Sequence, residues 1–343
     1  VDATRSLQVG PAHDPGTVMA PLAVPPTGRL LDALTVLGEG ESWLLEPRCL
    51  DPVEEGGDGR SWTPGIRIGV RPGSVFHRTE VFGPVLGLIA VEDLNEALQV
   101  QNSVDFGLTG GIHSLDPLEV ARWLGAVEVG NAYVNRETTG AVVQRQPFGG
   151  WKRSSVGPGA KTGGPDYLLQ LGTWMPTREF SEVDQAEALV SDEVWWDKHY
   201  GIDRDPVGLF CESNVHRYRP HPDLVVRIGP GAKAAEVERV LAASARCGVE
   251  PRISRATDED DAEFSRSLSA HRFGRVRAIG FLSEVVRRAA SVHGVGVIDE
   301  AVTASGRLEL RHHLREQAVS QTLHRFGNLV ASGLSITKED RYD

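Results

Sequence analysis

Short apolar runs alternate with amphipathic segments of helical spacing in the middle of the chain. The apolar run at residues 85–91 is typical of a buried strand, and Asp93-Leu-Asn-Glu96 has the spacing of a capping box, which predicts a helix ending near Asn102. The same order returns with a strand at 108–113, a helix at about 117–125 and a strand at 131–135. Strands and helices that alternate at this length predict an α/β fold with an open, mostly parallel sheet.

A second series of alternating elements follows an acidic segment. Between residues 181 and 206 eight acidic residues stand against only Lys198 and Arg204, which predicts a linker at 176–206 with one short helix around Trp195. Beyond it we expect strands at 224–228, 249–253, 277–282 and 295–298, and helices at 233–246 and 283–290. The expected domains are therefore a first part at 1–175 and a second, smaller α/β domain at 207–343.

Charge and cysteine content narrow the class of protein. The 343 residues include 36 Lys and Arg against 47 Asp and Glu, a net charge of -11, which has the wrong sign for binding nucleic acid or an anionic membrane. No apolar run approaches the ~20 residues of a membrane helix. Three scattered cysteines predict no disulfide framework and favour the cytoplasm. The residues that follow Val1 contain no leader, so we expect the chain to be the middle of a longer protein.

Two segments are candidates for chemistry. Arg145-Gln-Pro-Phe-Gly-Gly-Trp-Lys-Arg-Ser-Ser-Val-Gly-Pro-Gly-Ala-Lys-Thr-Gly-Gly-Pro165 is rich in glycine, which indicates either close backbone approach to a ligand or a long surface loop. Thr79-Glu80-Val-Phe82-Gly83-Pro84 places an acid and an aromatic residue before a turn that can fix where both point. The alternative for the second segment is a solvated glutamate beside a core phenylalanine.

Taken together, these segments resemble the C-terminal half of the aldehyde dehydrogenase fold. The motifs that carry the resemblance are Glu80-Val-Phe-Gly-Pro-Val85, Asp105-Phe-Gly-Leu-Thr-Gly-Gly-Ile-His-Ser114, Gly130-Asn-Ala-Tyr-Val-Asn-Arg136, Thr139-Gly-Ala141 and Arg145-Gln-Pro-Phe-Gly-Gly-Trp-Lys152. With Gly157-Pro-Gly-Ala-Lys-Thr-Gly-Gly-Pro165, they are similar to the L-glutamate-γ-semialdehyde (1-pyrroline-5-carboxylate) dehydrogenases, and especially to the dehydrogenase part of bifunctional bacterial proline-utilisation enzymes.

The resemblance continues past residue 175. Three segments look like the C-terminal extension of the large family members: Trp195-Trp196, Glu212-Ser-Asn-Val-His-Arg-Tyr-Arg-Pro220 and Leu314-Arg-Glu-Gln-Ala-Val-Ser-Gln-Thr-Leu-His-Arg-Phe-Gly-Asn328. That extension resembles a dehydrogenase domain that has lost its active site and covers the catalytic unit.

The resemblance also implies roles for particular residues. Glu80 would hold the nicotinamide ribose of NAD and Phe82 would lie against the nicotinamide ring. Gly140 and Ala141 would anchor the substrate α-carboxylate through backbone N–H groups, and Phe148 would line the aldehyde pocket. FAD is expected only if a proline dehydrogenase domain precedes this chain. Three cations near the glycine-rich segment are either anion binders or solvated side chains: Arg145, Lys152 and Lys161.

The family reaction needs a nucleophilic cysteine and a glutamate base, and the resemblance places both before Val1. Cys49, Cys211 and Cys247 stand outside the family's Gly-Gln-x-Cys context, and we interpret them as small packed residues. We therefore expect no catalytic residue in this chain. The function we expect is NAD-dependent oxidation of L-glutamate γ-semialdehyde to L-glutamate in proline catabolism, by a longer, homo-oligomeric cytoplasmic protein. The alternative is a non-catalytic module with a structural or assembly role.

Two further patterns predict little. Gly229-Pro-Gly-Ala-Lys-Ala234 has the form of a dinucleotide-binding turn, but Pro230 removes a backbone donor, and a plain glycine turn before an alanine-rich helix explains it as well. The histidines His312, His313 and His324 lack the spacing of a zinc site, so no metal is expected.

Overall fold

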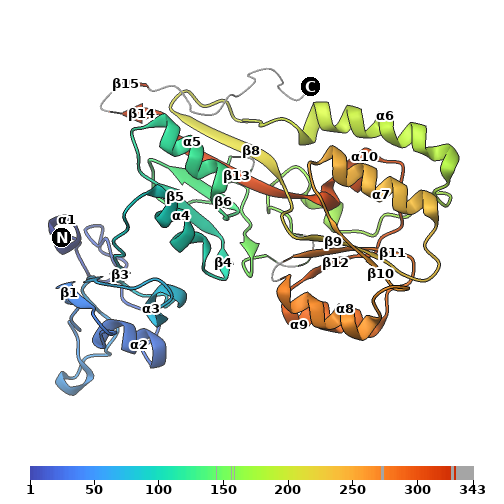
Figure 1. Ribbon diagram of the computed structural model, residues 1–343. Helices are drawn as coiled ribbons and strands as arrows, with labels where there is room; N and C mark the ends of the chain where they lie inside the picture. Colours follow the sequence, from blue (N-terminus) through green and yellow to red (C-terminus); the bar gives the residue numbers. More distant parts are fainter. Residues whose placement is uncertain (144, 156, 158, 272–273, 326–327, 330–343) are drawn as a thin grey trace. The chain divides into compact units, whose positions relative to one another are not determined.

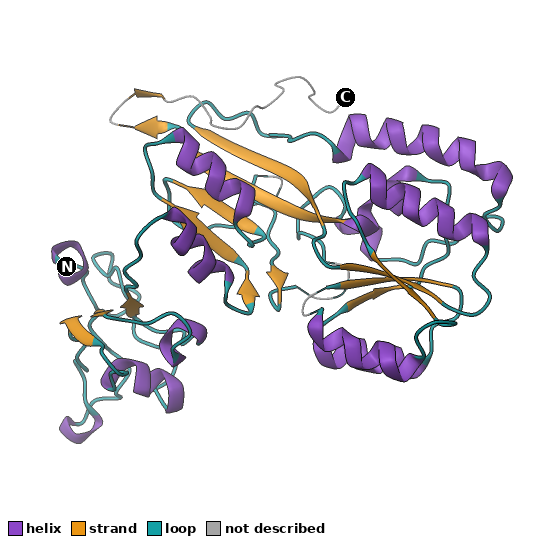
Figure 2. Cartoon of the chain, in the orientation of Figure 1, coloured by secondary structure: helices purple, strands orange, loops and turns teal. Residues whose placement is uncertain are grey.

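The computed structural model describes residues 1–143, 145–155, 157, 159–271, 274–325 and 328–329, and its contacts divide the chain into two compact units, Val1–Val104 and Asp105–Asp343 (Figures 1 and 2). Both units combine helices with sheets that contain parallel strand pairs, which confirms the predicted α/β class. The expected division into parts at 1–175, 176–206 and 207–343 stays a prediction.

The first unit contains a three-stranded sheet of order β1-β2-β3. β1 (Ser42–Leu45) is antiparallel to β2 (Gly65–Ile68), which is parallel to β3 (Val85–Gly87). The helices are α1 (Asp2–Arg5), α2 (Gly28–Thr35), α3 (Val75–Arg78) and α4 (Leu94–Asn102). α4 begins after Asp93, whose side chain accepts from two backbone N–H groups, as predicted. The predicted buried strand at 85–91 is only three residues long and lies at the sheet edge, paired on one side by β2, with Leu86 exposed.

A mixed sheet in the second unit brings together strands that are far apart in sequence. Its order is β5 (Thr109–Ile112), β6 (Asn131–Val134), β13 (Leu314–Thr322) and β8 (Glu212–Pro220), with β6 parallel to both neighbours and β8 antiparallel to β13. In this register Ala318 is paired with Asn131. Helix α5 (Pro117–Ala126) connects β5 to β6 and begins at the predicted N-cap, Asp116.

The second sheet of this unit is fully parallel, with order β10 (Arg252–Arg255), β9 (Leu224–Ile228), β11 (Arg275–Ile279) and β12 (Gly296–Ile298). Helices α8 (Asp261–Ser267) and α9 (Glu284–His293) cover one face, and α7 (Ala234–Arg246) covers the other with α10 (Gly306–Glu309) (Figure 1). Each face of this sheet packs into its own hydrophobic core. Successive residues of β9 point to opposite faces, so Val225 packs with Phe264 in one core and Val226 packs with Val240 in the other. The strand predicted at 277–282 spans Arg275–Ile279 instead. It ends before Gly280, which adopts a φ of +77°.

Several shorter elements complete the second unit. They are the strand pairs β4 (Phe106–Gly107) with β7 (Trp151–Lys152) and β14 (His324–Arg325) with β15 (Asn328–Leu329), and the 3-10 turns at Tyr167–Gln170, Glu182–Asp184, Leu268–Ala270 and Leu310–His313; another such turn, Val53–Glu55, lies in the first unit.

The acidic segment contains a longer helix than its sequence predicts. Helix α6 spans Gln185–Trp195 and continues as a π-helical turn, Trp196–Tyr200. Ser181 and Asp184 form a capping box on the 3-10 turn Glu182–Asp184, which leads directly into α6. Asp192 of α6 is buried and receives two hydrogen bonds of 2.7 and 2.8 Å from the guanidinium of Arg239 on α7. We call the parallel sheet β10-β9-β11-β12 and its covering helices the C-terminal sheet layer. The acid-rich segment therefore contains a helix that packs against this layer.

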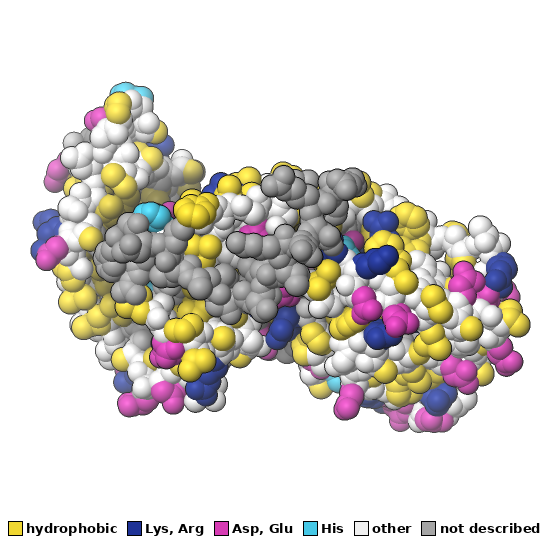
Figure 3. Space-filling model, turned by 90° about the horizontal axis from the view of Figure 1, so that it is seen from above, with side chains coloured by type: hydrophobic (Ala, Val, Ile, Leu, Met, Phe, Trp, Pro, Cys, Tyr) yellow, Lys and Arg dark blue, Asp and Glu magenta, His cyan; other side chains and the backbone are white. Residues whose placement is uncertain are grey.

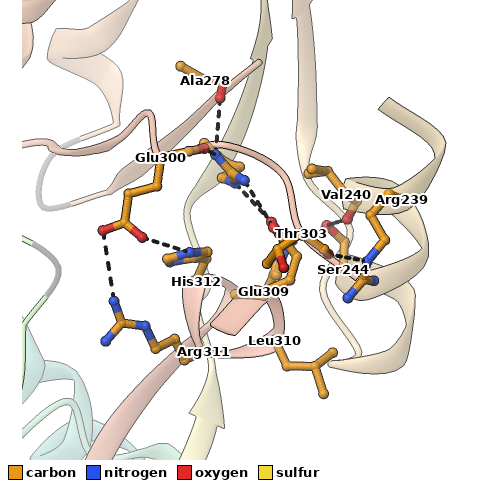
Figure 4. A network of polar contacts seen from close by, with 12 residues as sticks. Arg239, Val240, Ser244, Ala278, Glu300, Thr303, Glu309, Leu310, Arg311 and His312 are labelled. Atoms are coloured by element: carbon orange, nitrogen blue, oxygen red, sulfur yellow. Dashed lines mark hydrogen bonds and ion pairs between the residues drawn. The ribbon is translucent and has the colours of Figure 1, made fainter. Parts of the chain in front are cut away.

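A buried polar network lies beside this helix layer. Arg277 of β11 donates to both carboxylate oxygens of Glu309, at 2.8 and 3.0 Å, and neither side chain is exposed. Figure 4 shows Glu309 with its neighbours, including His312, which faces Glu300 at 3.8 Å. Burial would raise the pKa of Glu309, but the charge of Arg277 holds it well below its usual value.

The surface mixes both signs of charge. On the face shown in Figure 3, acidic and basic side chains are interspersed among apolar ones over the described residues. Within the same residues, no helix combines the length and apolar character needed to cross a bilayer.

Candidate functional site

The predicted cofactor residues lie on the surface of the first unit, between α3 and β3. Phe82 is 81% exposed and adopts a φ of +51°, a conformation that bulky residues rarely occupy. Gly83 lets the turn pass Leu30, because a Cβ there would lie 2.2 Å from Leu30 Cδ1. Glu80 is exposed and has no hydrogen-bond or ion-pair partner among the residues the structure describes. Phe82 is therefore not a core residue, and the alternative given for this segment is wrong on that point.

The predicted carboxylate anchor belongs to a loop that leaves the end of β6. Asn135, at a φ of +55°, starts this loop; its side chain accepts from the backbone N–H of Ser114 at 3.0 Å and donates to the Ser114 carbonyl at 2.9 Å. Gly140 is exposed, with a φ of +114°, and its carbonyl accepts from Tyr133 Oη at 2.9 Å. Ala141 follows it and is also exposed. We name the described residues 136–143, 145 and 146 the anchor loop.

Two arginines at the ends of the anchor loop share one carboxylate. Glu212, the first residue of β8, lies 2.6 Å from Arg145 Nη2 and 3.4 Å from Arg136 Nη1. Burial alone would raise the pKa of Glu212, but hydrogen bonds from Arg145 and Asn214 and the charge of Arg136 keep it below its ordinary value. Arg145 is therefore engaged in an ion pair and is neither a solvated cation nor a free anion binder.

A chain of polar side chains continues from Glu212 into the sheet. Asn214 Nδ2 donates to Glu212 Oε2 at 3.1 Å, and Ser320 of β13 donates to Asn214 Oδ1. Ser320 Oγ also lies 3.1 Å from the side-chain amide of Gln146, which is buried at the end of the anchor loop. Strands β8 and β13 thus contact the anchor loop through side chains that the sequence places far away.

Lys161 is buried and donates hydrogen bonds within the protein, so it is not an anion binder. Only 2% of it is exposed, and its Nζ donates to Asn131 Oδ1 at 3.0 Å and to the Gly149 carbonyl at 2.6 Å. Asn131 in turn donates to the Pro147 carbonyl at 3.0 Å. Burial lowers the pKa of Lys161 to about 7. These bonds fix the backbone on both sides of Phe148.

Phe148 and Lys152 are also held by local contacts. Phe148 exchanges two backbone hydrogen bonds with Thr162, of 2.9 and 3.0 Å, and its side chain is half-buried. Lys152, at a φ of +53°, forms an ion pair with Glu128 at 2.7 Å. Every one of the three cations near the glycine-rich segment therefore has a protein partner.

A cavity of about 460 Å³ lies behind the anchor loop, where Val143 and Pro147 form part of its wall. Tyr218 also lines the cavity, and its Oη donates to Asp166 Oδ2 at 2.5 Å and lies 2.7 Å from His199 Nε2. Of the predicted substrate residues, neither Gly140, Ala141 nor Phe148 lines this cavity. Tyr218, Asp166 and His199 form a polar cluster beside this cavity. The sequence did not predict this cluster, because its three members come from separate segments with no common spacing.

The cysteines occupy three unrelated environments. Cys247 is buried at the end of α7, where burial raises the pKa of its thiol. Burial also raises the pKa of Cys49, which is only partly buried. Cys211 is exposed, so its interpretation as a packed residue is wrong. Because a nucleophilic cysteine needs a lowered pKa, neither Cys49 nor Cys247 has the environment of a catalytic thiolate.

The turn at residues 229–234, which has the form of a dinucleotide-binding turn, is filled by a neighbouring loop of the same chain. Phe281 donates its backbone N–H to the Pro230 carbonyl at 2.8 Å, and a Cβ on Gly229 would lie 2.0 Å from the Phe281 carbonyl oxygen. At the start of α7, Glu236 accepts from the backbone N–H of Lys233 at 3.1 Å, where a bound phosphate would receive such bonds. This turn is therefore explained by packing between two loops.

The histidines do not form a metal centre. His312 and His313 are buried, and burial lowers the pKa of both imidazoles. His324 is exposed. Over the described ranges, no three His, Cys, Asp or Glu side chains are grouped in a way that could hold a metal ion.

Comparisons of this chain with known proteins agree on one family. A model of the aldehyde dehydrogenase family matches residues 1–173. The 1-pyrroline-5-carboxylate dehydrogenase of Geobacillus sp. (strain WCH70) is 33% identical over 171 residues, 49% of this chain and 32% of that protein. The protein of the same name from Staphylococcus epidermidis is 44% identical over 108 residues, 32% of this chain and 21% of the relative. This chain thus spans about a third or less of the length of these curated relatives.

One solved structure matches almost the whole chain. Proline utilization A from Corynebacterium freiburgense is similar with a TM-score of 0.82 and 46% identity, over 96% of this chain and 34% of that chain. The family match covers the cofactor segment and the anchor loop, and the structural match extends through the C-terminal sheet. The resemblance inferred from the motifs is confirmed, and the chain belongs to the aldehyde dehydrogenase family.

Proposed function

We propose that this chain forms the C-terminal part of an enzyme that oxidises L-glutamate γ-semialdehyde to L-glutamate with NAD. The matched relatives named 1-pyrroline-5-carboxylate dehydrogenase support this substrate. The family's cysteine nucleophile and glutamate base would come from a part of the enzyme outside this chain. Assembly as a cytoplasmic homo-oligomer in proline catabolism belongs to the same proposal, and FAD would be needed only by a separate proline dehydrogenase domain.

The exposed segment at 80–82 fits the nicotinamide end of NAD. The Glu80 carboxylate offers two acceptor oxygens that suit the two hydroxyls of a ribose. The Phe82 ring is exposed in a strained conformation, so it offers an apolar face that its own unit does not use. NAD, when bound, supplies the hydride acceptor. Glu80 and Phe82 would fix its position.

The conformation and exposure of Gly140 are the main support for the proposed substrate. Its φ of +114° and its exposure leave the loop tip open to an outside anion, which backbone N–H groups of the loop would bind, as in a nest. Both neighbouring arginines are paired with Glu212, which compensates one of their two positive charges, and the direct contacts to the anion would come from the loop backbone. An aldehyde with an α-carboxylate matches such a loop, and Phe148 would contact its carbon chain.

The test compares the loop with the cofactor segment in the enzyme that contains this chain and the family nucleophile. Gly140→Val should raise the KM for the semialdehyde at least tenfold, because it adds a side chain where φ is positive. Its KM for NAD should stay within twofold. Glu80→Gln should show the opposite pattern. Wild-type KM values in both variants would overturn the assignments.

The non-catalytic module remains a second candidate because neither Cys49 nor Cys247 has the environment of a thiolate. The two proposals differ in one assay. An enzyme should form NADH from the semialdehyde when this chain is expressed together with the rest of the catalytic unit. If no protein that contains this chain forms NADH, the module is the correct alternative.

A further inference from the structure

We propose that Glu212 is a positioning residue for the anchor loop, and that with Asn214 and Ser320 it makes the loop selective for aldehydes that carry an α-carboxylate. The inference rests on the proposed function and assigns part of the specificity to strands β8 and β13 of the C-terminal segment. Nothing in the local sequence of the loop indicates these residues.

The geometry connects Glu212 to both ends of the loop. Its carboxylate lies 3.4 Å from Arg136 Nη1 at the start and 2.6 Å from Arg145 Nη2 at the end. Arg136 is also close to the loop tip, since its Nη2 lies 4.0 Å from the position of a Cβ on Gly140. A movement of Glu212 would therefore be transmitted to the backbone that presents the anion-binding N–H groups.

The sheet holds Glu212 in turn. Asn214 donates to Glu212 Oε2 at 3.1 Å, and Ser320 connects Asn214 to Gln146. Asn214, Ser320 and Gln146 are all nearly fully buried. Since hydrogen-bonded polar groups resist rearrangement when they are buried, the chain from Gln146 to Glu212 holds the loop against β8 and β13.

Charge gives Glu212 a second effect. Without its carboxylate, Arg136 and Arg145 would keep two positive charges in a partly buried place with no acid to compensate them. Repulsion between them would separate the ends of the loop and change the alignment of the N–H groups at Gly140 and Ala141. Misplacement of a binding group by ~1 Å can cost as much as 10²-fold in rate.

The experiment measures two aldehydes in the full enzyme: L-glutamate γ-semialdehyde and butanal, which has no carboxylate. Glu212→Gln should raise the KM for the semialdehyde tenfold or more, change kcat less than threefold, and leave kcat/KM for butanal within threefold of wild type. The inhibition constant of L-glutamate should rise with the KM. Ser320→Ala should act in the same direction more weakly, and Glu212→Asp should restore part of the affinity because it keeps the charge.

Glu259→Gln is the matched control. Glu259 also pairs with an arginine, Arg252, at 2.7 and 2.8 Å, but it belongs to the C-terminal sheet layer, so both aldehydes should keep wild-type kinetics. Equal losses of Glu212→Gln on both aldehydes, or no loss on either, would overturn the inference. Absence of semialdehyde oxidation by the wild-type enzyme would instead reject the proposed function, and the inference with it.

Discussion

Lys161 donates from its Nζ to Asn131 Oδ1 at 3.0 Å inside the second unit, and so joins the glycine-rich segment to the first residue of β6. Asn131 also accepts from the backbone N–H of Gly149 at 3.2 Å. A lysine that looked suited to a ligand instead connects the glycine-rich segment to a strand. Its position next to Phe148 connects the stability of this region to the shape of the proposed aldehyde pocket.

Burial of Lys161 should make stability depend on pH. Its pKa is lowered from 10.5 to about 7, so between pH 7 and 10.5 the unfolded chain binds the proton more tightly than the folded chain. The free energy of unfolding should therefore rise with pH through this window, as the charge penalty of the folded state disappears. Urea unfolding at pH 7 and pH 9.5 should show a larger rise in wild type than in Lys161→Met. An equal rise in both proteins would contradict this.

Removal of one partner of the buried pair Arg277–Glu309 should strongly destabilise the C-terminal sheet layer. Glu309→Gln leaves the buried guanidinium of Arg277 without its counter-charge, which should cost about 3–5 kcal/mol. The double variant Arg277→Met with Glu309→Met should be more stable than the single variant, because no charge is then left buried. Denaturant unfolding of the three proteins tests the order, and a double variant less stable than the single one would refute it.

The same pair has a predictable acid dependence. The pKa of Glu309 lies well below its usual value of 4.5 in the folded protein. The stability from this carboxylate is therefore fully present above pH 4.5 and is lost as pH falls through its folded pKa. The difference in unfolding free energy between wild type and Glu309→Gln should shrink as the pH is lowered from 6 toward 3.

Local signals predicted the elements well where neighbouring residues stabilise them. Asp93 and Asp116 start their helices at the expected residues because a side-chain cap satisfies free N–H groups within two or three residues. The buried strand 224–228 was found because its apolar run is covered on both faces by helices. Gly140 adopts a positive φ, as glycine in a turn often does, while the role of its loop as a carboxylate anchor stays a prediction.

Long-range contacts could not be predicted in the same way. The pairing of Ala318 with Asn131 and the ion pairs of Glu212 depend on which strands meet in the sheet, and no local spacing encodes that choice. Lys161 was misjudged for the same reason, since its burial comes from neighbours distant in sequence. The length of α6 could not be predicted either, because Arg239, the partner of its buried Asp192, lies far away in the sequence.

We expect the strained conformation of Phe82 to lower the stability of the protein while its ring contributes to NAD binding. Its φ of +51° strains a bulky residue by about 1–3 kcal/mol, and an exposed ring recovers little of that cost by packing. Phe82→Asn, a residue that tolerates this conformation, should leave the free energy of unfolding equal or higher. In the full enzyme it should raise the KM for NAD about tenfold if the ring contacts the cofactor. Lower stability together with an unchanged KM would exclude both parts of this prediction.

Tyr218 should stabilise the second unit through its bond to a charged acceptor. Its Oη donates to Asp166 Oδ2, and the pKa of Asp166 is lowered in spite of burial by hydrogen bonds from His199 and Tyr218. Hydrogen bonds to charged groups contribute about 1.5–3 kcal/mol, against about 0.5–1.5 kcal/mol for neutral ones. Tyr218→Phe should therefore destabilise the protein more than Tyr200→Phe, whose hydroxyl donates to the neutral carbonyl of Arg307. Thermal unfolding of the two variants at pH 7 measures the difference, and an equal loss in both would show that the charge of Asp166 adds nothing at this position.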